Sequence, residues 1–313
     1  MVKKDNYVIG THNGIFHCDE LVAISLFKIL LKDIKNVQII RSRDLKYLNE
    51  KCNVLIDIGE GKFDHHQKGG NGKRKNGASF ASAGLVWKEY GTYIINKITN
   101  YNFSISDMNE LIDNIDKEII MDVDLEDNGE NVEKHYFSFV NSFLPKWYEK
   151  EDYNKQFEEA LNYVCCILEN LLSSEISKKI SYLEICDRLK NPKTKLNNVL
   201  IVPAQTIQWL EPVVLYNSKN NEKVDFVIFP YPDGGFALQC VPKSLDEKFS
   251  KRIELPENWA GETIKLPEIS GISSAIMCHK GRFFARAKEF DDILKMCSVA
   301  TYLYEEKTSL TRK

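Results

Sequence analysis

Apolar runs alternate with amphipathic stretches in the first hundred residues. The runs Tyr7–Thr11, Val37–Ile40 and Asn53–Ile58 are short and apolar, which is typical of buried strands. Glu20–Leu31 and Ala81–Tyr93 carry apolar residues at helical spacing and predict two helices. Strands that alternate with helices form mostly parallel sheets, and such sheets bind ligands beyond the carboxyl ends of their strands.

The pattern changes further along the chain. Residues 104–134 are rich in acids and are predicted to be mostly helical, and residues 150–190 are also predicted to form helices. From about residue 195, strand-like runs such as Val199–Val202 and Phe236–Val241 are separated by Pro, Gly and Asn. These patterns predict a second α/β domain.

The expected fold class is therefore α/β with two domains. The N-terminal domain has a mostly parallel sheet with flanking helices, and the C-terminal α/β domain is smaller. We place the metal-binding catalytic domain at residues 1–150, a helical connector at 151–194, and the substrate-binding domain at 195–313.

The composition is that of an ordinary soluble globular chain. Of 313 residues, 43% are hydrophobic and 28% are charged, and the apolar runs are far shorter than the ~20 residues of a bilayer span. The polar opening Met1–Asn6 has no secretory h-region, which predicts an intracellular protein with no secretion signal and no membrane partner. The eight scattered cysteines are expected to be mostly reduced and buried. The net charge of −3 means that any polyanion binding would be local.

Four of the six histidines lie within 55 residues of one another, and two of these are on one loop. His12, His17 and Asp19 follow the first predicted strand, and Gly14 lets the loop turn sharply. Asp19 stands where a helix begins, a position that suits both a helix cap and a metal ligand. Together the three residues favour a metal site over the alternative, in which Asp19 only caps the helix.

A second group follows the third predicted strand. Asp57 interrupts that apolar strand, where a carboxylate is costly to bury unless it is paired or binds a metal. Its two oxygens could bridge two cations ~3.5–4 Å apart. In an extended segment His65 and His66 would point opposite ways, so one would bind metal and the other would face the substrate. Asp64 would accept a proton from an imidazole and fix its tautomer.

Three weaker candidates remain. Asp127, or Asp124, could complete the metal set, although a solvated helix end explains these acids equally well. The glycine-rich loop of residues 67–77 has four cationic residues and no acid, which suits a phosphodiester backbone but also a plain flexible loop. Near the C-terminus, His279, Lys280 and Arg282 are cationic candidates, unless that segment is an ordinary surface loop.

These residues carry a family resemblance. The run THNGIFHCDE, followed by VLIDIG, FDHHQ and SAGLVW, resembles the MYG1 family of the DHH phosphoesterase superfamily. Seven further segments of the chain fit the family's motifs, so the resemblance extends from about residue 8 to 300. They are Arg41–Asp44, Asp124–Gly129, Asn141–Trp147, Leu238–Pro242, Leu255–Gly261, Ser270–Ile272 and Cys278–Gly281.

The resemblance implies a metal-dependent 3′-5′ RNA exonuclease with its active site between two domains. Family members act in the nucleus and the mitochondrion, whereas this chain has no Arg-rich presequence before Tyr7. We therefore expect an intracellular protein of the cytoplasm or nucleus. The superfamily usually has Asp where this chain has His17, and the family's Gly-rich stretch is replaced by residues 282–286 here. By position the implied metal ligands are His12, His17, Asp19, Asp57, His65 and Asp127.

We expect two divalent ions, with Mn²⁺ preferred and Mg²⁺, Co²⁺ or Zn²⁺ possible, to activate a water that attacks phosphorus. The expected partner is RNA or a short oligonucleotide, and homo-oligomers are possible. The alternatives are a small-molecule phosphoesterase acting on pyrophosphate or a short nucleotide, and a non-catalytic metal-binding protein. The absence of an H-E-x-x-H motif disfavours a metallopeptidase. The expected catalytic residues are His66, Asp64, His279 and Arg282, and the expected substrate-binding residues are Arg43, Ser82, Lys68, Lys73, Arg74 and Lys280.

Overall fold

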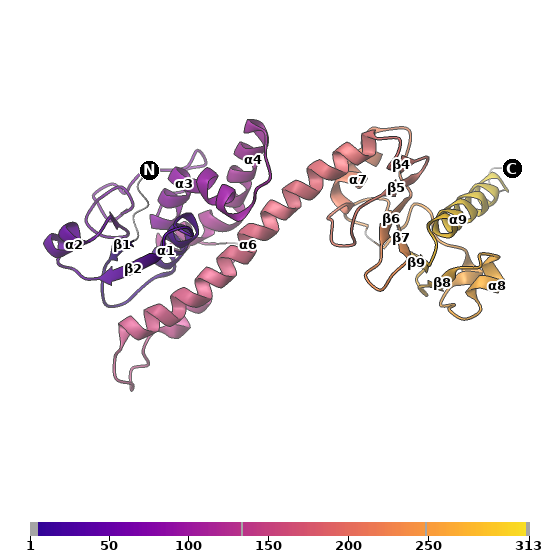
Figure 1. Cartoon of the computed structure of the whole chain (residues 1–313). Helices are drawn as coiled ribbons and strands as arrows, with labels where there is room; N and C mark the ends of the chain where they lie inside the picture. The colour runs from indigo at the N-terminus through magenta and orange to yellow at the C-terminus, as the bar shows by residue number, and fades with distance from the viewer. Residues whose placement is uncertain (1–5, 133, 248, 311–313) are drawn as a thin grey trace. The chain divides into compact units, whose positions relative to one another are not determined.

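The computed structural model describes residues 6–132, 134–247 and 249–310. The chain divides into two compact units, Met1–Ser177 and Lys178–Lys313. The division falls inside the 38-residue helix α6 (Tyr153–Lys190), which contributes to both units (Figure 1). Residues 150–190, predicted as several helices, thus form one helix over most of their length. The predicted α/β class is confirmed, with a small parallel sheet in the first unit and a mixed sheet in the second.

The sheet of the first unit has three parallel strands in the order β2-β1-β3. They are β1 (Asn6–Thr11), β2 (Asn36–Arg41) and β3 (Val54–Leu55), joined by α1 (Cys18–Leu30) and α2 (Leu45–Lys51). β3 is shorter than the predicted run, because Asp57 has a φ of 59° in the left-handed region and the chain turns away after Ile56.

Helices pack beside this sheet and build most of the first core. Nearly all of α1 is buried, and it packs on α3 (Ser82–Ile98). The acid-rich stretch forms α4 (Ile105–Ile115), the π-helical turn η1 (Asp116–Ile120) and α5 (Met121–Asp127), as its composition predicted. The 3-10 helix η2 (Ser138–Phe143) then leads to α6, whose Phe157 packs edge-on against Phe16.

The second unit contains a six-stranded mixed sheet in the order β4-β5-β6-β7-β9-β8. Residues 226–229 at its centre are buried because both faces of the sheet are covered there. In β6, Phe226 and Ile228 face the core beneath α9, whereas Val227 and Phe229 face the core beneath α7. The elements are β4 (Lys195–Leu196), β5 (Val199–Ile201), α7 (Leu210–Lys219), β6 (Phe226–Pro230), β7 (Phe236–Cys240), η3 (Glu257–Trp259), α8 (Leu266–Ser270), β8 (Ala275–Cys278), β9 (Phe284–Ala287) and α9 (Phe290–Leu310).

Two other expectations concern cysteines and membranes. All eight cysteines are free thiols, but only Cys240, Cys278 and Cys297 are buried, so the expectation that most are buried is wrong. Among the described helices, none combines the length and the apolar character that a bilayer crossing requires.

Candidate metal centre

Residues of the candidate site come from the carboxyl ends of β1 and β3. His12 directly follows β1, and Asp57 stands two residues after β3. Because these strands are parallel neighbours, their ends lie at the same edge of the sheet, and both side chains are buried there. Asp57 holds a backbone conformation that non-glycine residues seldom adopt, and such strain is typical of functional sites.

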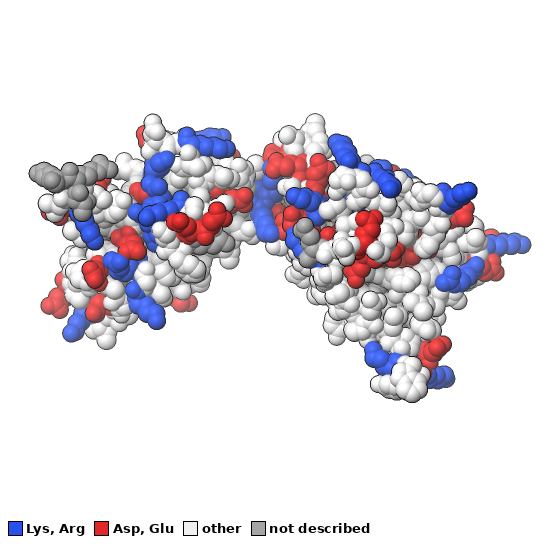
Figure 2. Space-filling model, turned by 180° about the vertical axis from the view of Figure 1, so that it is seen from behind, with Lys and Arg blue, Asp and Glu red and all other residues white. Residues whose placement is uncertain are grey.

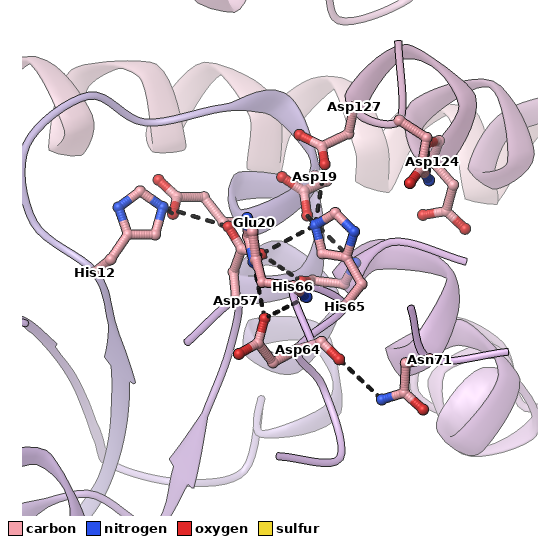
Figure 3. A network of polar contacts seen from close by, with 12 residues as sticks. His12, Asp19, Glu20, Asp57, Asp64, His65, His66, Asn71, Asp124 and Asp127 are labelled. Atoms are coloured by element: carbon pink, nitrogen blue, oxygen red, sulfur yellow. Dashed lines mark hydrogen bonds and ion pairs between the residues drawn. The ribbon is translucent and has the colours of Figure 1, made fainter. Parts of the chain in front are cut away.

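Asp57 lies at the middle of the cluster in Figure 3. Its Oδ2 is 3.3 Å from Nε2 of His12, and its Oδ1 is 3.3 Å from both Nε2 of His65 and Nδ1 of His66. The hydroxyl of Ser82 donates a hydrogen bond to the same Oδ1 at 3.0 Å. The two oxygens of this carboxylate therefore face different histidines, as a carboxylate that bridges two cations requires.

Three groups of side chains could each hold a metal ion, since the donor atoms within each group all lie within 4.8 Å of one another. Asp57 and His17 each belong to two of the groups, so the groups are linked. The three sets are His12, His17 and Asp57; Asp57, His65 and His66; and His17, Asp19 and Asp127. All six residues implied as ligands are brought together, with His66 in addition.

Buried oxygens in the cluster test whether a cation would fit. Oδ1 of Asp19 is buried and has no hydrogen-bond partner among the described residues, and buried Oδ2 of Asp57 has only the ring of His12, 3.3 Å away, beside it. A buried carboxylate oxygen without a donor is costly, and a divalent cation would remove that cost. The donors are imidazole nitrogens and carboxylate oxygens, a mixture that suits Mn²⁺, Zn²⁺ and related ions. The residues present therefore fit a divalent metal.

The amino end of helix α3 points into the carboxylates. Asp19 accepts a hydrogen bond from the backbone amide of Ser82 at 3.3 Å, and Asp124 accepts one from that of Gly84 at 2.9 Å. These acids satisfy amides that a helix leaves unpaired, and the helix dipole stabilises their charge. Asp19 thus caps α3 rather than its own helix α1, whose N-cap residue His17 makes no capping hydrogen bond.

The carboxylates change the protonation of the two buried histidines. Burial lowers the pKa of His12, but hydrogen bonds to Asp57 and Glu20 outweigh it and raise the pKa to about 10. Burial likewise lowers the pKa of His65, whereas Asp127 and Asp57 raise it to about 10. In the metal-free protein both rings are therefore cationic at neutral pH.

The acids respond in opposite directions. Burial raises the pKa of Asp19 well above its usual value, and the neighbouring charges of Asp57 and Asp127 add to that rise. For Asp57, burial also favours the neutral form, but hydrogen bonds from His12 and His65 lower its pKa below the usual range. Asp57 is therefore the cluster's constant negative charge.

The two adjacent histidines do not point opposite ways as predicted. Their ring centroids lie 4.4 Å apart, and both rings reach the same oxygen of Asp57. The reason is that residues 64–66 are not in a strand, so the alternation of side chains does not apply. The rings differ in exposure, because His65 is nearly buried whereas the His66 side chain is 59% exposed. Asp64 accepts a hydrogen bond from Nδ1 of His66 at 2.9 Å.

The structure distinguishes the two candidate acids of α5. Asp127 lies 3.0 Å from Nε2 of His65, within the cluster. Asp124 is fully buried and makes an ion pair of 2.8 Å with Arg74, which also binds Asp116 at 2.7 Å. Asp124 is thus a structural residue, and Asp127 is the candidate ligand.

Two residues that were predicted to contact the substrate are buried and paired within the protein. Arg74 was expected to meet the substrate from a flexible loop, but its buried guanidinium binds Asp116 and Asp124. Ser82 is fully buried, and its hydroxyl donates a hydrogen bond to Asp57. Three other predicted substrate contacts are exposed, namely Lys68, Lys73 and Arg43. Their substrate-binding roles stay predictions.

The three C-terminal candidates lie in the second unit, in the connection from β8 to β9. Nδ1 of His279 accepts a hydrogen bond from the amide of Gly281 at 3.0 Å. Arg282 has a φ of 54° and binds Glu254. The predicted roles of His279, Lys280 and Arg282 toward the substrate are not tested by these contacts.

Sequence reasoning missed Glu20 and the wall of the cavity. Glu20 is fully buried, pairs with Nε2 of His12 and accepts a hydrogen bond of 3.2 Å from Thr11. A glutamate at the start of an otherwise apolar helix could have been the signal. A cavity of about 340 Å³ opens beside the cluster, and its wall includes Phe137 and Val140 of the α5–α6 segment, which no sequence pattern marked. It is lined by His17, Cys18, His65, His66, Glu126, Asp127, Phe137, Val140 and Asn141.

These features define a class: an α/β protein that gathers imidazoles and carboxylates at one edge of a parallel sheet, where they could bind divalent metal. Comparison with protein families is more specific. A model named MYG1_exonuc, described as an uncharacterised protein family (UPF0160), matches residues 8–301. The chain therefore belongs to the MYG1 family, as its motifs indicated.

Individual relatives match over most of their length. The MYG1 protein of Dictyostelium discoideum is 30% identical, over 96% of this chain and 98% of that protein. The MYG1 protein YER156C of Saccharomyces cerevisiae is 28% identical, over 93% and 95% respectively. A mouse relative named MYG1 exonuclease is 26% identical, over 88% of this chain and 80% of that protein.

Proposed function

We propose that this protein is a metal-dependent phosphodiesterase that removes nucleotides from the 3′ end of RNA. Three observations support the proposal: the metal-ligand cluster, the adjoining cavity, and membership of a family with a mouse relative named as an exonuclease. The observation that most supports the proposal is the position of Asp57, because its one carboxylate faces His12 on one side and both His65 and His66 on the other.

We infer two divalent cations, with Mn²⁺ preferred over Mg²⁺, Co²⁺ or Zn²⁺. Asp57 would hold them together with His12, His17, Asp19, His65 and Asp127. When bound, such ions would make water a stronger nucleophile by lowering its pKa toward neutrality, and would neutralise phosphoryl charge.

The protein's own residues hold and orient the reacting groups. Asp64 accepts from Nδ1 of His66 and orients the ring of this exposed histidine, whose Nε2–H in the imidazolium form would donate to a phosphoryl oxygen. We further propose that Lys68, Lys73 and Arg43 contact the phosphate backbone, together with His279, Lys280 and Arg282 of the second unit. Positive and negative residues are interspersed on the face drawn in Figure 2, so such contacts would be local.

A second candidate is a phosphoesterase for short nucleotides or pyrophosphate. The size of the cavity favours it, since about 340 Å³ is at the lower end of ligand pockets. Both candidates use the same cluster and differ only in what occupies the space outside the cavity.

The test uses 5′-labelled RNA, a dinucleotide and pyrophosphate, each with Mn²⁺, Mg²⁺, Co²⁺ or Zn²⁺. Stepwise shortening of the RNA, blocked by a 3′-phosphate, is expected for the exonuclease. Cleavage of only the dinucleotide or pyrophosphate would support the second candidate instead.

The matched variants are Asp57→Asn and Asp33→Asn. Asp57→Asn should abolish turnover. It should also bind at least one metal ion fewer than the wild type, which elemental analysis after gel filtration measures. Asp33 forms a surface ion pair with Lys97 in the same unit, and its variant should behave as wild type. Unchanged turnover and metal content in Asp57→Asn would contradict the proposal.

A further inference from the structure

The segment that joins α5 to α6 is rich in aromatic residues. Residues 136–148 contain six aromatic side chains in thirteen positions, whereas aromatics make up 11% of the whole chain. The same segment supplies Phe137, Val140 and Asn141 to the wall of the metal-site cavity. The segment therefore connects the candidate metal centre to the surface around it.

Ring contacts run from the cavity wall outward. The ring of Phe137 lies 6.3 Å from that of Phe139, which lies 6.2 Å from that of Phe143. Phe143 in turn lies 5.3 Å from Tyr163 on α6, and the Tyr163 side chain is 59% exposed. We call Phe137, Phe139, Phe143 and Tyr163 the aromatic strip.

A second aromatic pair follows in the same segment. Trp147 is 93% exposed, and its ring packs edge-on against that of Tyr148 at 5.6 Å. The ammonium group of Lys146 donates to the backbone carbonyl of Ser142 at 2.7 Å, which braces the turn before this pair. Large aromatic surface left open to solvent commonly marks a binding site.

The charge of the segment indicates how a ligand would bind. Residues 134–152 hold three lysines and three acids, so their formal charges cancel if His135 is neutral. A polyanion would gain little from phosphate neutralisation here. Bases of a nucleic acid can stack on aromatic rings regardless of sequence, and this contact needs no net charge.

We propose that the aromatic strip and Trp147 bind the unpaired bases of the RNA strand that lie outside the metal-site cavity. This inference rests on the proposed function and specifies its substrate as single-stranded. A cavity of about 340 Å³ would hold the terminal nucleotide, and the following nucleotides need a surface that begins at its wall. Paired bases are already stacked in a duplex and could not use these rings.

The first experiment measures binding of 5′-fluorescein-labelled oligouridylate of twelve nucleotides by anisotropy in EDTA, where no turnover occurs. Tyr163→Ala and Trp147→Ala should each weaken binding about tenfold, whereas Tyr163→Phe should not. The salt dependence of binding should stay the same in each variant. The matched control is Tyr93→Ala, since Tyr93 lies on α3 of the same unit and is 62% exposed.

Tryptophan fluorescence supplies a second readout. The chain has four tryptophans, all within the described residues, and Trp87, Trp209 and Trp259 are buried. Quenching by oligouridylate should therefore come from Trp147 and should disappear in Trp147→Phe, while the binding of labelled RNA persists. A blunt-ended RNA duplex should cause no quenching.

The outcomes separate this inference from the proposed function. Wild-type affinity in both alanine variants would overturn the inference, even if RNA is cleaved. A change in oligomeric mass with unchanged RNA binding would overturn it too, and would assign the strip to a second copy of the chain. Strip-dependent binding without Mn²⁺-dependent cleavage would uphold the inference and refute the proposed function.

Discussion

The hydroxyl of Ser82 donates a hydrogen bond of 3.0 Å to Oδ1 of Asp57, and both residues are buried. This contact joins the amino end of α3 to the carboxylate at the centre of the metal-ligand cluster. Carboxylates that bind metals are commonly held by such second partners, whose loss weakens metal binding 10- to 100-fold.

Ser82→Ala should therefore lower the affinity for Mn²⁺ by about tenfold while the fold persists. Titration calorimetry measures the affinity, and circular dichroism checks the fold. Ser25→Ala is the matched control, because Ser25 is a buried serine of α1 whose hydroxyl bonds to the carbonyl of Leu21. Equal Mn²⁺ affinity in the two variants would show that Ser82 does not position Asp57.

The two acids of α5 should respond differently to the same substitution. Asp127→Ala should weaken Mn²⁺ binding with little loss of stability, since Asp127 lies beside His65 in the cluster. Asp124→Ala should cost about 3 kcal/mol of unfolding free energy, because it leaves the buried Arg74 without one partner. Urea unfolding and metal titration of both variants test this, and the reverse pattern would make Asp124 the ligand.

Gly84 lies where α3 meets Asp124 and Arg74. A Cβ added to Gly84 would stand 1.9 Å from Oδ2 of Asp124 and 2.7 Å from Nη2 of Arg74. Gly84→Ala should therefore destabilise the protein by about 1–3 kcal/mol, although alanine favours a helix. Gly61→Ala is the control, since nothing lies within 4 Å of its added Cβ. A higher urea midpoint for Gly84→Ala than for the wild type would contradict the close packing of Gly84 against Asp124 and Arg74.

Metal binding should release protons and strengthen as pH rises. The pKa values of His12 and His65 are raised from 6.5 to about 10 in the metal-free protein, so both rings must lose a proton to bind metal at pH 7.5. Their contribution to the stability of the metal-free fold is complete below pH 6.5 and is lost as pH rises through about 10.

Titrations with Mn²⁺ in two buffers of different ionisation enthalpy measure this release. The observed heats should differ in proportion to the protons released, and affinity should rise by up to about tenfold per pH unit for each proton displaced. Identical heats in the two buffers would show that the histidines are already neutral.

The residue types of the candidate site could be predicted because they stand at strand ends. His12 follows β1 and Asp57 follows β3, and the apolar runs that form these strands are local patterns. Parallel strands bring their carboxyl ends to one edge, so the convergence of these side chains follows from the order of elements. The resemblance to the family's motifs also indicated Asp127 as a metal ligand. Hydrophobic periodicity alone could not distinguish it from Asp124.

Local patterns could not predict contacts between distant parts of the chain. The placement of Arg74 on Asp116 and Asp124 depends on how a loop packs against η1 and α5, 42 and 50 residues away along the chain. The sequence showed only a cationic glycine-rich stretch, which suits a solvated loop equally well. The burial of Ser82 also depends on contacts between distant parts of the chain. So does the position of two adjacent histidines beside the same oxygen of Asp57.

The amino-acid order thus determined which side chains are available and at which strand ends they stand, because backbone periodicity is a short-range property. Tertiary packing decided which acid lies in the metal cluster, which cationic side chains are buried, and which aromatic rings line the cavity. Those outcomes depend on burial and on charge pairing between elements, and both arise only when the helices close over the sheet.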